Sequence, residues 1–120
     1  MLEKPLQVRV TPGRLPSSTV IAATGALVLE HVITFQDAWK AVPAGAVIFD
    51  LSGVVYMDSS ALGSLVNAHV FFSQQARRIA LAGVTDRVLQ LLKMTRVETL
   101  FAIFPNVEAA ETSINSAASA

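Results

Sequence analysis

The sequence contains no cysteine, and only 15% of its 120 residues are charged. The absence of cysteine excludes disulfide bonds and thiolate metal sites, and it suits a reducing compartment. Nine basic and nine acidic residues cancel to a formal net charge of zero. The chain therefore has no field that would gather nucleic acid or an anionic membrane. So few charges are compatible with a surface that a protein partner covers.

Long apolar runs are also missing. Residues 1–10 lack the apolar segment of a signal peptide, and the uncharged stretch 59–76 is interrupted by Ser, Asn, His and Gln, unlike a membrane span. The hydrophobic content of 52% and the mean hydropathy of +0.53 argue against disorder. We expect one cytoplasmic domain over residues 1–115, large enough to bury a single core, and a flexible tail over residues 116–120.

Apolar periodicity and turn residues predict alternating strands and helices. The first two strands are joined by a short turn and should pair as a hairpin, whereas helices separate the later strands. This order predicts an α/β domain with a mixed sheet of about five strands, the last of them at an edge. Strands are predicted over residues 6–10, 18–28, 46–52, 78–84 and 100–104, and helices over 31–42, 60–75, 86–94 (capped by Thr85) and 107–114 (capped by Asn106).

Asp58, Ser59 and Ser60 stand where the strand after residue 46 gives way to the helix over 60–75. The common interpretation is a helix cap, because Ser and Asp accept hydrogen bonds from the free N–H groups of a first turn. A cap does not need three polar residues, so one serine remains to be explained. The same N–H groups and the helix dipole favour an anion. A phosphate on an exposed serine there would change the surface more than the fold.

The segment DLSGVVYMDSSALGSLVNA, residues 50–68, resembles the core motif of the STAS domain, a family named for sulfate transporters and anti-sigma factor antagonists. The likeness is closest to the free-standing bacterial anti-sigma factor antagonists. It extends to VIAATGALV, RIALAGV and the C-terminal segment 88–114. The resemblance implies a single STAS domain: a four- or five-stranded mixed sheet with about four helices packed on it, on one side.

The resemblance also implies a partner switch in transcription regulation. The dephosphorylated antagonist would bind an anti-sigma factor that is also a serine kinase, and a PP2C-type phosphatase would reverse the phosphorylation. By position the phosphoacceptor is Ser59, while Asp58 would orient the local loop and Ser60 would hydrogen-bond the first helical turn. No enzymatic activity, cofactor, metal, nucleic acid or membrane is expected. The predicted partner-binding residues, small and close to one helical side, are Asp58, Ser59, Ser60, Gly63, Ser64 and Asn67.

The chain departs from the family at two positions. Val28 stands where an acidic residue often follows the glycine of the second strand, and Arg96 stands where a glycine is common. The same domain would also serve a stressosome-like scaffold or a lipid-transport accessory subunit, and a homodimer remains open. A serine hydrolase is a lesser alternative, because YMDSSAL lacks the G-x-S-x-G elbow and neither histidine is assigned as a base.

Overall fold

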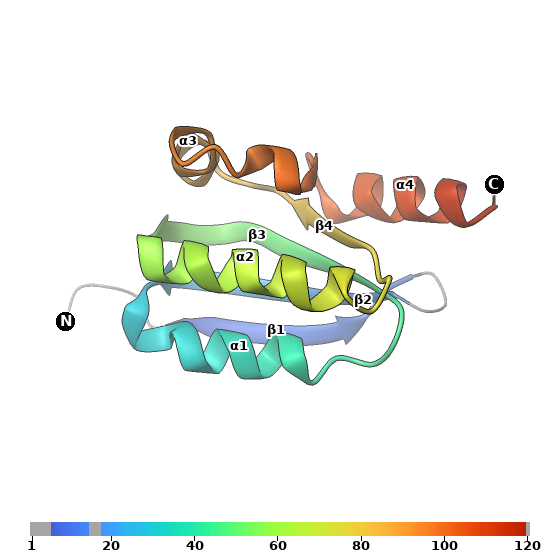
Figure 1. The fold of residues 1–120 in the computed structure, drawn as a ribbon, viewed down its shortest axis with the longest axis horizontal. Coiled ribbons are helices and arrows are strands. Elements are labelled where there is room, and N and C mark those ends of the chain that lie inside the picture. The colour runs from blue at the N-terminus through green and yellow to red at the C-terminus, as the bar shows by residue number, and fades with distance from the viewer. Residues whose placement is uncertain (1–5, 15–17, 120) are drawn as a thin grey trace.

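The computed structural model describes residues 6–14 and 18–119. Five strands form one mixed sheet in chain order (Figure 1). The first two strands pair antiparallel and the others parallel, which confirms the predicted mixed five-stranded sheet with a hairpin at one edge. The strands are β1 (Gln7–Pro12), β2 (Ser18–Leu27), β3 (Ala46–Met57), β4 (Ile79–Ala82) and β5 (Ala102–Phe104).

The helices lie close to their predicted positions. Thr85 accepts a hydrogen bond from the Val88 N–H at 3.3 Å, and Asn106 accepts one from the Ala109 N–H at 2.8 Å, so both predicted caps are confirmed. The helices are α1 (Val32–Lys40), α2 (Ser59–Ser73), α3 (Asp86–Met94) and α4 (Val107–Ser119), with 3₁₀ turns η1 (Leu29–His31) and η2 (Glu98–Leu100).

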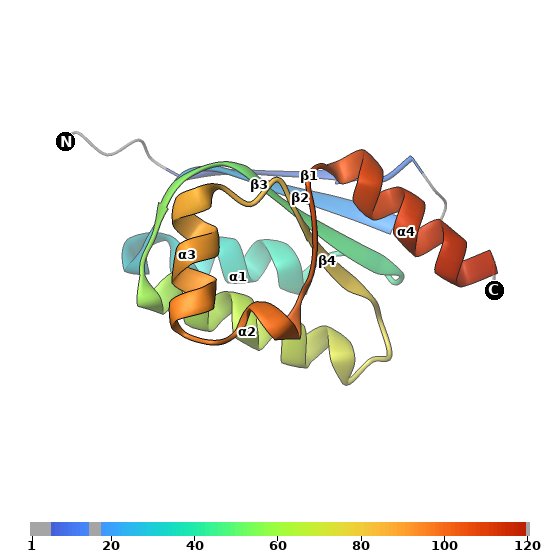
Figure 2. The same cartoon turned by 90° about the horizontal axis from the view of Figure 1, so that it is seen from above.

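Both faces of the sheet carry helices, which corrects the expectation that all helices lie on one side. Neighbouring residues of β3 point to opposite faces. Phe49 belongs to the main core, which α1, α2 and α3 cover, whereas Ile48 packs with Ala110 of α4. The view from above shows α4 on the other side of the sheet from α1 and α2 (Figure 2).

β3 is longer than predicted, because it continues from residue 52 to Met57 alongside the end of β2. Two register shifts accommodate this extension. The extension brings Asp58 beside Leu27, whose carbonyl accepts a hydrogen bond from the Asp58 N–H at 3.2 Å. The end of β2 and the start of α2 are therefore adjacent.

α4 reaches Ser119, so the helix predicted over 107–114 is too short. The domain boundary at residue 115 and the flexibility of residues 116–120 stay predictions. Among the described helices, none has the length and apolar character needed to cross a bilayer.

Candidate functional site

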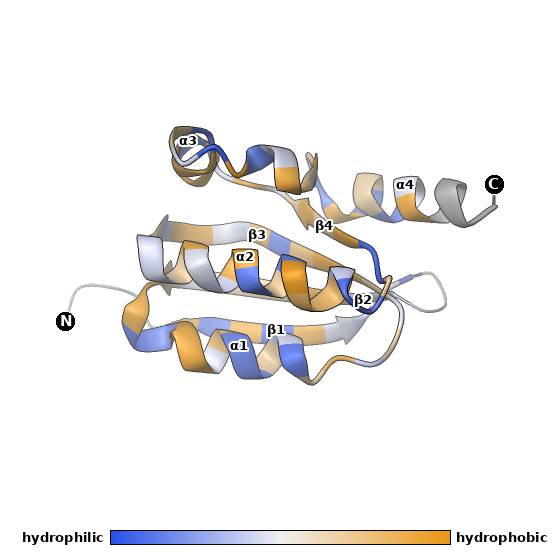
Figure 3. Cartoon of the chain, viewed as in Figure 1, coloured by the Kyte–Doolittle hydropathy of each residue, from blue (hydrophilic) through white to orange (hydrophobic). Residues whose placement is uncertain are grey.

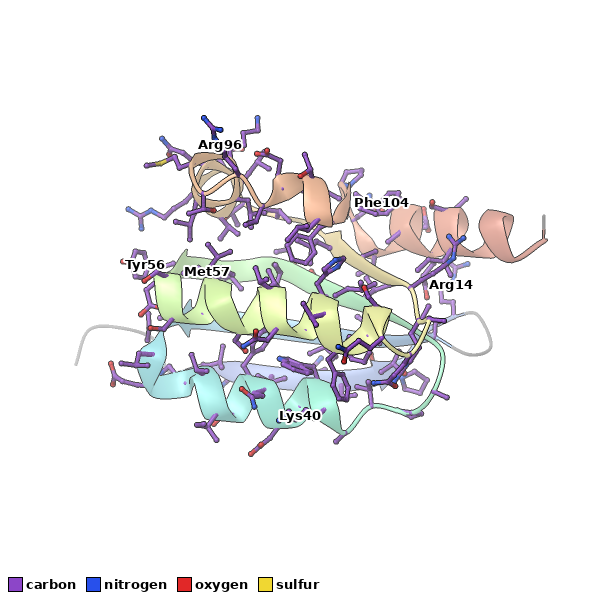
Figure 4. All side chains as sticks on the ribbon, viewed as in Figure 1. Arg14, Lys40, Tyr56, Met57, Arg96 and Phe104 are labelled. Atoms are coloured by element: carbon purple, nitrogen blue, oxygen red, sulfur yellow. The ribbon has the colours of Figure 1, made fainter. Side chains whose placement is uncertain are left out.

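Asp58 connects the start of α2 to the loop after β2. Its backbone is extended, and one carboxylate oxygen accepts a hydrogen bond from the Ala61 N–H at 2.9 Å, the geometry of an N-cap. The other oxygen accepts from the Leu29 N–H at 3.0 Å. Asp58 thus caps the helix and fixes the loop, which fits the loop-orienting role predicted for it. Tyr56 and Met57, labelled in Figure 4, lie at this end of the molecule.

Ser59 is the first residue of α2, and it is exposed. Ser60 follows it, half-buried. Because Asp58 supplies the cap, neither serine has to. Within the described residues no hydrogen bond of the Ser60 side chain to the first turn is present, so the bond expected of Ser60 is not formed. The exposure expected of a phosphoacceptor is confirmed for Ser59, while its phosphorylation stays a prediction.

The solvent-facing side of α2 repeats at intervals of four residues. Ser59, Gly63 and Asn67 are all exposed, as residues i, i+4 and i+8 of one helical face should be. Ser64 is different: it is only 3% exposed, and its hydroxyl accepts a long hydrogen bond of 3.4 Å from the Trp39 indole N–H. Including Ser64 in the partner surface was therefore wrong, because it lies against α1.

Gly63 has no structural role that the fold requires. A Cβ placed there would meet nothing within 4 Å, so close packing inside this chain does not call for a glycine. A glycine in mid-helix costs roughly 1 kcal/mol relative to alanine. None of the fifteen residues of α2 is charged, and charged residues are depleted where a protein interface is fully buried. A mid-helix glycine that the fold does not need, on a helix without charged residues, is typical of a surface that binds another protein.

Exposed apolar side chains occur on the segments next to α2, and the apolar pattern alone does not mark them as exposed. Leu29 and Ile33 are each 67% exposed, on η1 and the first turn of α1. Tyr56 is also exposed, with the Arg87 guanidinium 5.6 Å from its ring centroid. One signal was available: Ile33 falls outside the apolar stripe that contains Phe35 and Trp39. We call Ser59, Gly63, Asn67, Leu29 and Ile33 the α2 surface.

Neither a metal cluster nor a hydrogen bond from Ser59 to a histidine is present within the described ranges, 6–14 and 18–119. They hold no group of three His, Asp or Glu side chains suited to a metal ion. A serine nucleophile requires a base within hydrogen-bonding distance. The described residues include no hydrogen bond between Ser59 and a histidine, and the ring of His69 instead packs edge-on against Phe101 at 5.6 Å.

A family model described as STAS domain matches residues 7–110. An anti-sigma factor antagonist from Mycobacterium paratuberculosis superposes with a TM-score of 0.82 at 17% identity, over 92% of this chain and 95% of that one. The Bacillus cell fate determinant SpoIIAA in its phosphorylated form gives 0.70 at 14% identity, over 89% and 99% of the two chains. The murine anion transporter Slc26a9 gives 0.76 at 15% identity, where 87% of this chain matches 18% of the transporter.

Proposed function

Because the chain belongs to the STAS domain family, we propose that it is a cytoplasmic anti-sigma factor antagonist that acts by partner switching. In its dephosphorylated form the α2 surface binds an anti-sigma factor with serine kinase activity. Phosphorylation of Ser59 releases that partner, and a PP2C-type phosphatase restores binding. Similar solved structures support the proposal: the Mycobacterium protein and unphosphorylated SpoIIAA are both described as anti-sigma factor antagonists, and SpoIIAA is also represented in a phosphorylated form.

One observation supports the proposal most: Ser59 is exposed beside a carboxylate that already caps the helix. The serine is not needed for the fold, so a kinase can use its hydroxyl. In the reaction the Ser59 Oγ takes the γ-phosphoryl group of ATP, its proton leaves, and ADP departs. The new group carries about −1.5 to −2 charges at pH 7.

The fold should tolerate this charge better than an interface does. The dipole and free N–H groups of the first turn stabilise an anion, which offsets part of the repulsion from Asp58. A partner that covers the uncharged face of α2 would have to desolvate the phosphate. Burying an unpaired charge costs several kcal/mol, and each 1.4 kcal/mol is tenfold in affinity.

The test is a titration of Ser59 variants against the anti-sigma factor kinase encoded by the same genome. Ser59→Ala should bind the partner but take up no phosphate, as intact mass after incubation with kinase and ATP will report. Ser59→Glu should fold and bind at least about tenfold more weakly. Gly63→Trp should also weaken binding, because it fills the open space above the helix.

Two controls separate the role of Ser59 from general effects of charge. Ser73→Glu places the same charge on the exposed far end of α2, about 21 Å away along the helix, and should bind like the unmodified chain. Ser60→Ala should still take up phosphate. If Ser60→Ala abolishes uptake while Ser59→Ala retains it, the acceptor is misassigned. If Ser59→Glu binds as tightly as wild type, the charge does not control binding.

A second candidate is a scaffold or accessory subunit, of stressosome or lipid-transport type, that uses the same surface. The match to a segment of the murine transporter Slc26a9 supports this second candidate, because in that protein the same fold forms part of a larger chain. Light scattering discriminates between the two functions. A scaffold should assemble into large particles, whereas an antagonist should remain a small species.

A further inference from the structure

The two edges of the sheet differ in how well they are protected against pairing. β5 has only three residues and is followed at once by Pro105, and both features disfavour pairing with a strand of another chain. β1 has six residues, keeps an unbroken register with β2, and contains no bulge. In the described part of the chain no other strand pairs with its outer side (Figure 1). Such an edge is a template for a further strand.

The register identifies the backbone groups that point outward from β1. Gly13 donates its N–H to the Ser18 carbonyl at 2.9 Å, in the same antiparallel register that pairs Gln7 with Thr24. Hydrogen-bonded pairs alternate along such a ladder. Gln7, Arg9 and Thr11 therefore bond to β2. Val8 and Val10 direct their N–H and C=O groups away from the sheet.

We propose that β1 pairs antiparallel with β1 of a second copy of this chain, with Val8 on the two-fold axis. In this register Val8 faces Val8 of the other copy, and Leu6 faces Val10. Leu6, Val8 and Val10 each carry both an N–H and a C=O group, so each can donate and accept a hydrogen bond between the two copies. On the open face, Gln7 lies opposite Arg9 of the other copy. No like charges meet, and the two main cores join into one continuous layer.

Neighbouring registers are less favourable. With Arg9 on the axis, two guanidinium groups would stand directly opposite each other, and like charges there are destabilising. With Val10 on the axis, Val8 would face Pro12, which has no N–H to donate. A shift by a single residue would turn the apolar side chains to the wrong face. The sequence QVRVTP thus favours the Val8 register over these alternatives.

Side-chain exposure agrees with this pairing. Val10 lies on the face covered by the helices, opposite buried Ile21, yet it is 45% exposed. Beside it is a hollow of about 270 Å³, lined by Val10, Pro12, Ser18, Thr19, Pro43 and Ala44. Leu6 of a second copy would cover Val10 there. Figure 3 shows the alternation of polar and apolar residues along β1 that makes one side of the new pair apolar.

The pairing also closes on itself. A two-fold axis pairs the β1 edge of one copy with the β1 edge of the other, so neither β1 edge can bind a third copy. The two edges that stay unpaired are both β5, and each is short and ends at Pro105. A dimer is therefore expected rather than a fibre. It leaves α2 free, because α1 and not α2 is the helix that lies against β1.

The test is analytical ultracentrifugation of the full chain at low ionic strength, from about 1 μM to 1 mM. The expected species at high concentration has twice the monomer mass of 12.8 kDa. Gln7 is exposed, so both charge variants at this position should fold alike, which circular dichroism will verify. Gln7→Glu places a carboxylate opposite Arg9 and should tighten the dimer about two- to thirty-fold, from two cross-strand pairs. Gln7→Lys should weaken it by a similar factor.

The double variant Gln7→Lys, Arg9→Glu reverses both charges and should restore the tight dimer. Ser59→Glu should leave the dimer constant unchanged, so this test is independent of the partner switch. A monomer at every concentration would overturn the proposal. A dimer that responds equally to Gln7→Glu and Gln7→Lys would also overturn it, because a different surface would then hold the two copies together.

Discussion

Replacing Asp58 by alanine should weaken the fold more than the loss of an ordinary helix cap. The cap itself contributes about 0.5–2 kcal/mol. The second hydrogen bond, to the Leu29 N–H, has a charged acceptor, and such bonds contribute about 1.5–3 kcal/mol, here near the lower limit because Leu29 is exposed. Since the two contributions share one carboxylate, we expect a total loss of about 2–3 kcal/mol.

Urea denaturation followed by circular dichroism measures this loss. With an m-value of about 1.5 kcal/mol/M, the midpoint should fall by roughly 1.3–2 M while m stays constant. Asp58→Asn keeps one oxygen and a good N-cap for Ala61, but its NH2 group cannot accept from the Leu29 N–H, so it should lose about 1.5 kcal/mol, less than Asp58→Ala. Asp50→Ala is the matched acidic control, because among the described residues the Asp50 carboxylate bonds only to nearby Ser52. Equal stability of Asp58→Ala and wild type would refute the double role of the carboxylate.

Substitutions at four further positions should alter the urea midpoint in stated directions. His69→Leu should raise stability by about 1 kcal/mol, because the buried Nδ1 has no hydrogen-bond partner in the part of the chain that the structure describes. A lower midpoint would show that the imidazole is needed for packing. Arg77→Ala should lower stability by about 2 kcal/mol, since this guanidinium bonds the Gly45 carbonyl at 2.8 Å, and Arg77→Lys should recover part of the loss. Gly63→Ala should raise stability by about 0.5–1 kcal/mol. Gly83→Ala should lower it, because the φ angle of Gly83 is +67° and an added Cβ would lie 2.8 Å from Ser52. If Gly63→Ala were the less stable of the two variants, the assignment of Gly63 to an external contact would be contradicted.

Much of the fold could be predicted because local patterns and tertiary contacts agree. The apolar periods locate all five strands and four helices, and Thr85 caps α3 as its position suggested. The extension of β3 could not be predicted. Residues 53–57 depend on pairing with β2 through two register shifts, which are properties of the sheet and not of the segment. The position of α4 on the second face likewise depends on how a short connection turns after β5.

The site was predicted in part. The local pattern locates Asp58 and Ser59 at the start of α2, but two long-range contacts could not be read from it. One is the bond from the Leu29 N–H to Asp58, which joins residues 29 positions apart. The other is the contact of Ser64 with Trp39, which turns a small polar residue inward. Leu29 could not be identified because an exposed apolar residue resembles a core residue in sequence, whereas the position of Ile33 outside the apolar stripe was a usable signal.

The two proposed surfaces have a joint consequence. In a dimer through β1, each copy presents its own α2 residues Ser59, Gly63 and Asn67, because α1 and not α2 lies against the edge strand. A partner that is itself dimeric could then bind both copies, and its second contact would form at a raised effective concentration. Phosphorylation of one Ser59 would remove one of the two contacts and that advantage together. Variants at Gln7 should therefore change partner binding only when the partner is bivalent, whereas Ser59→Glu should weaken it in every case.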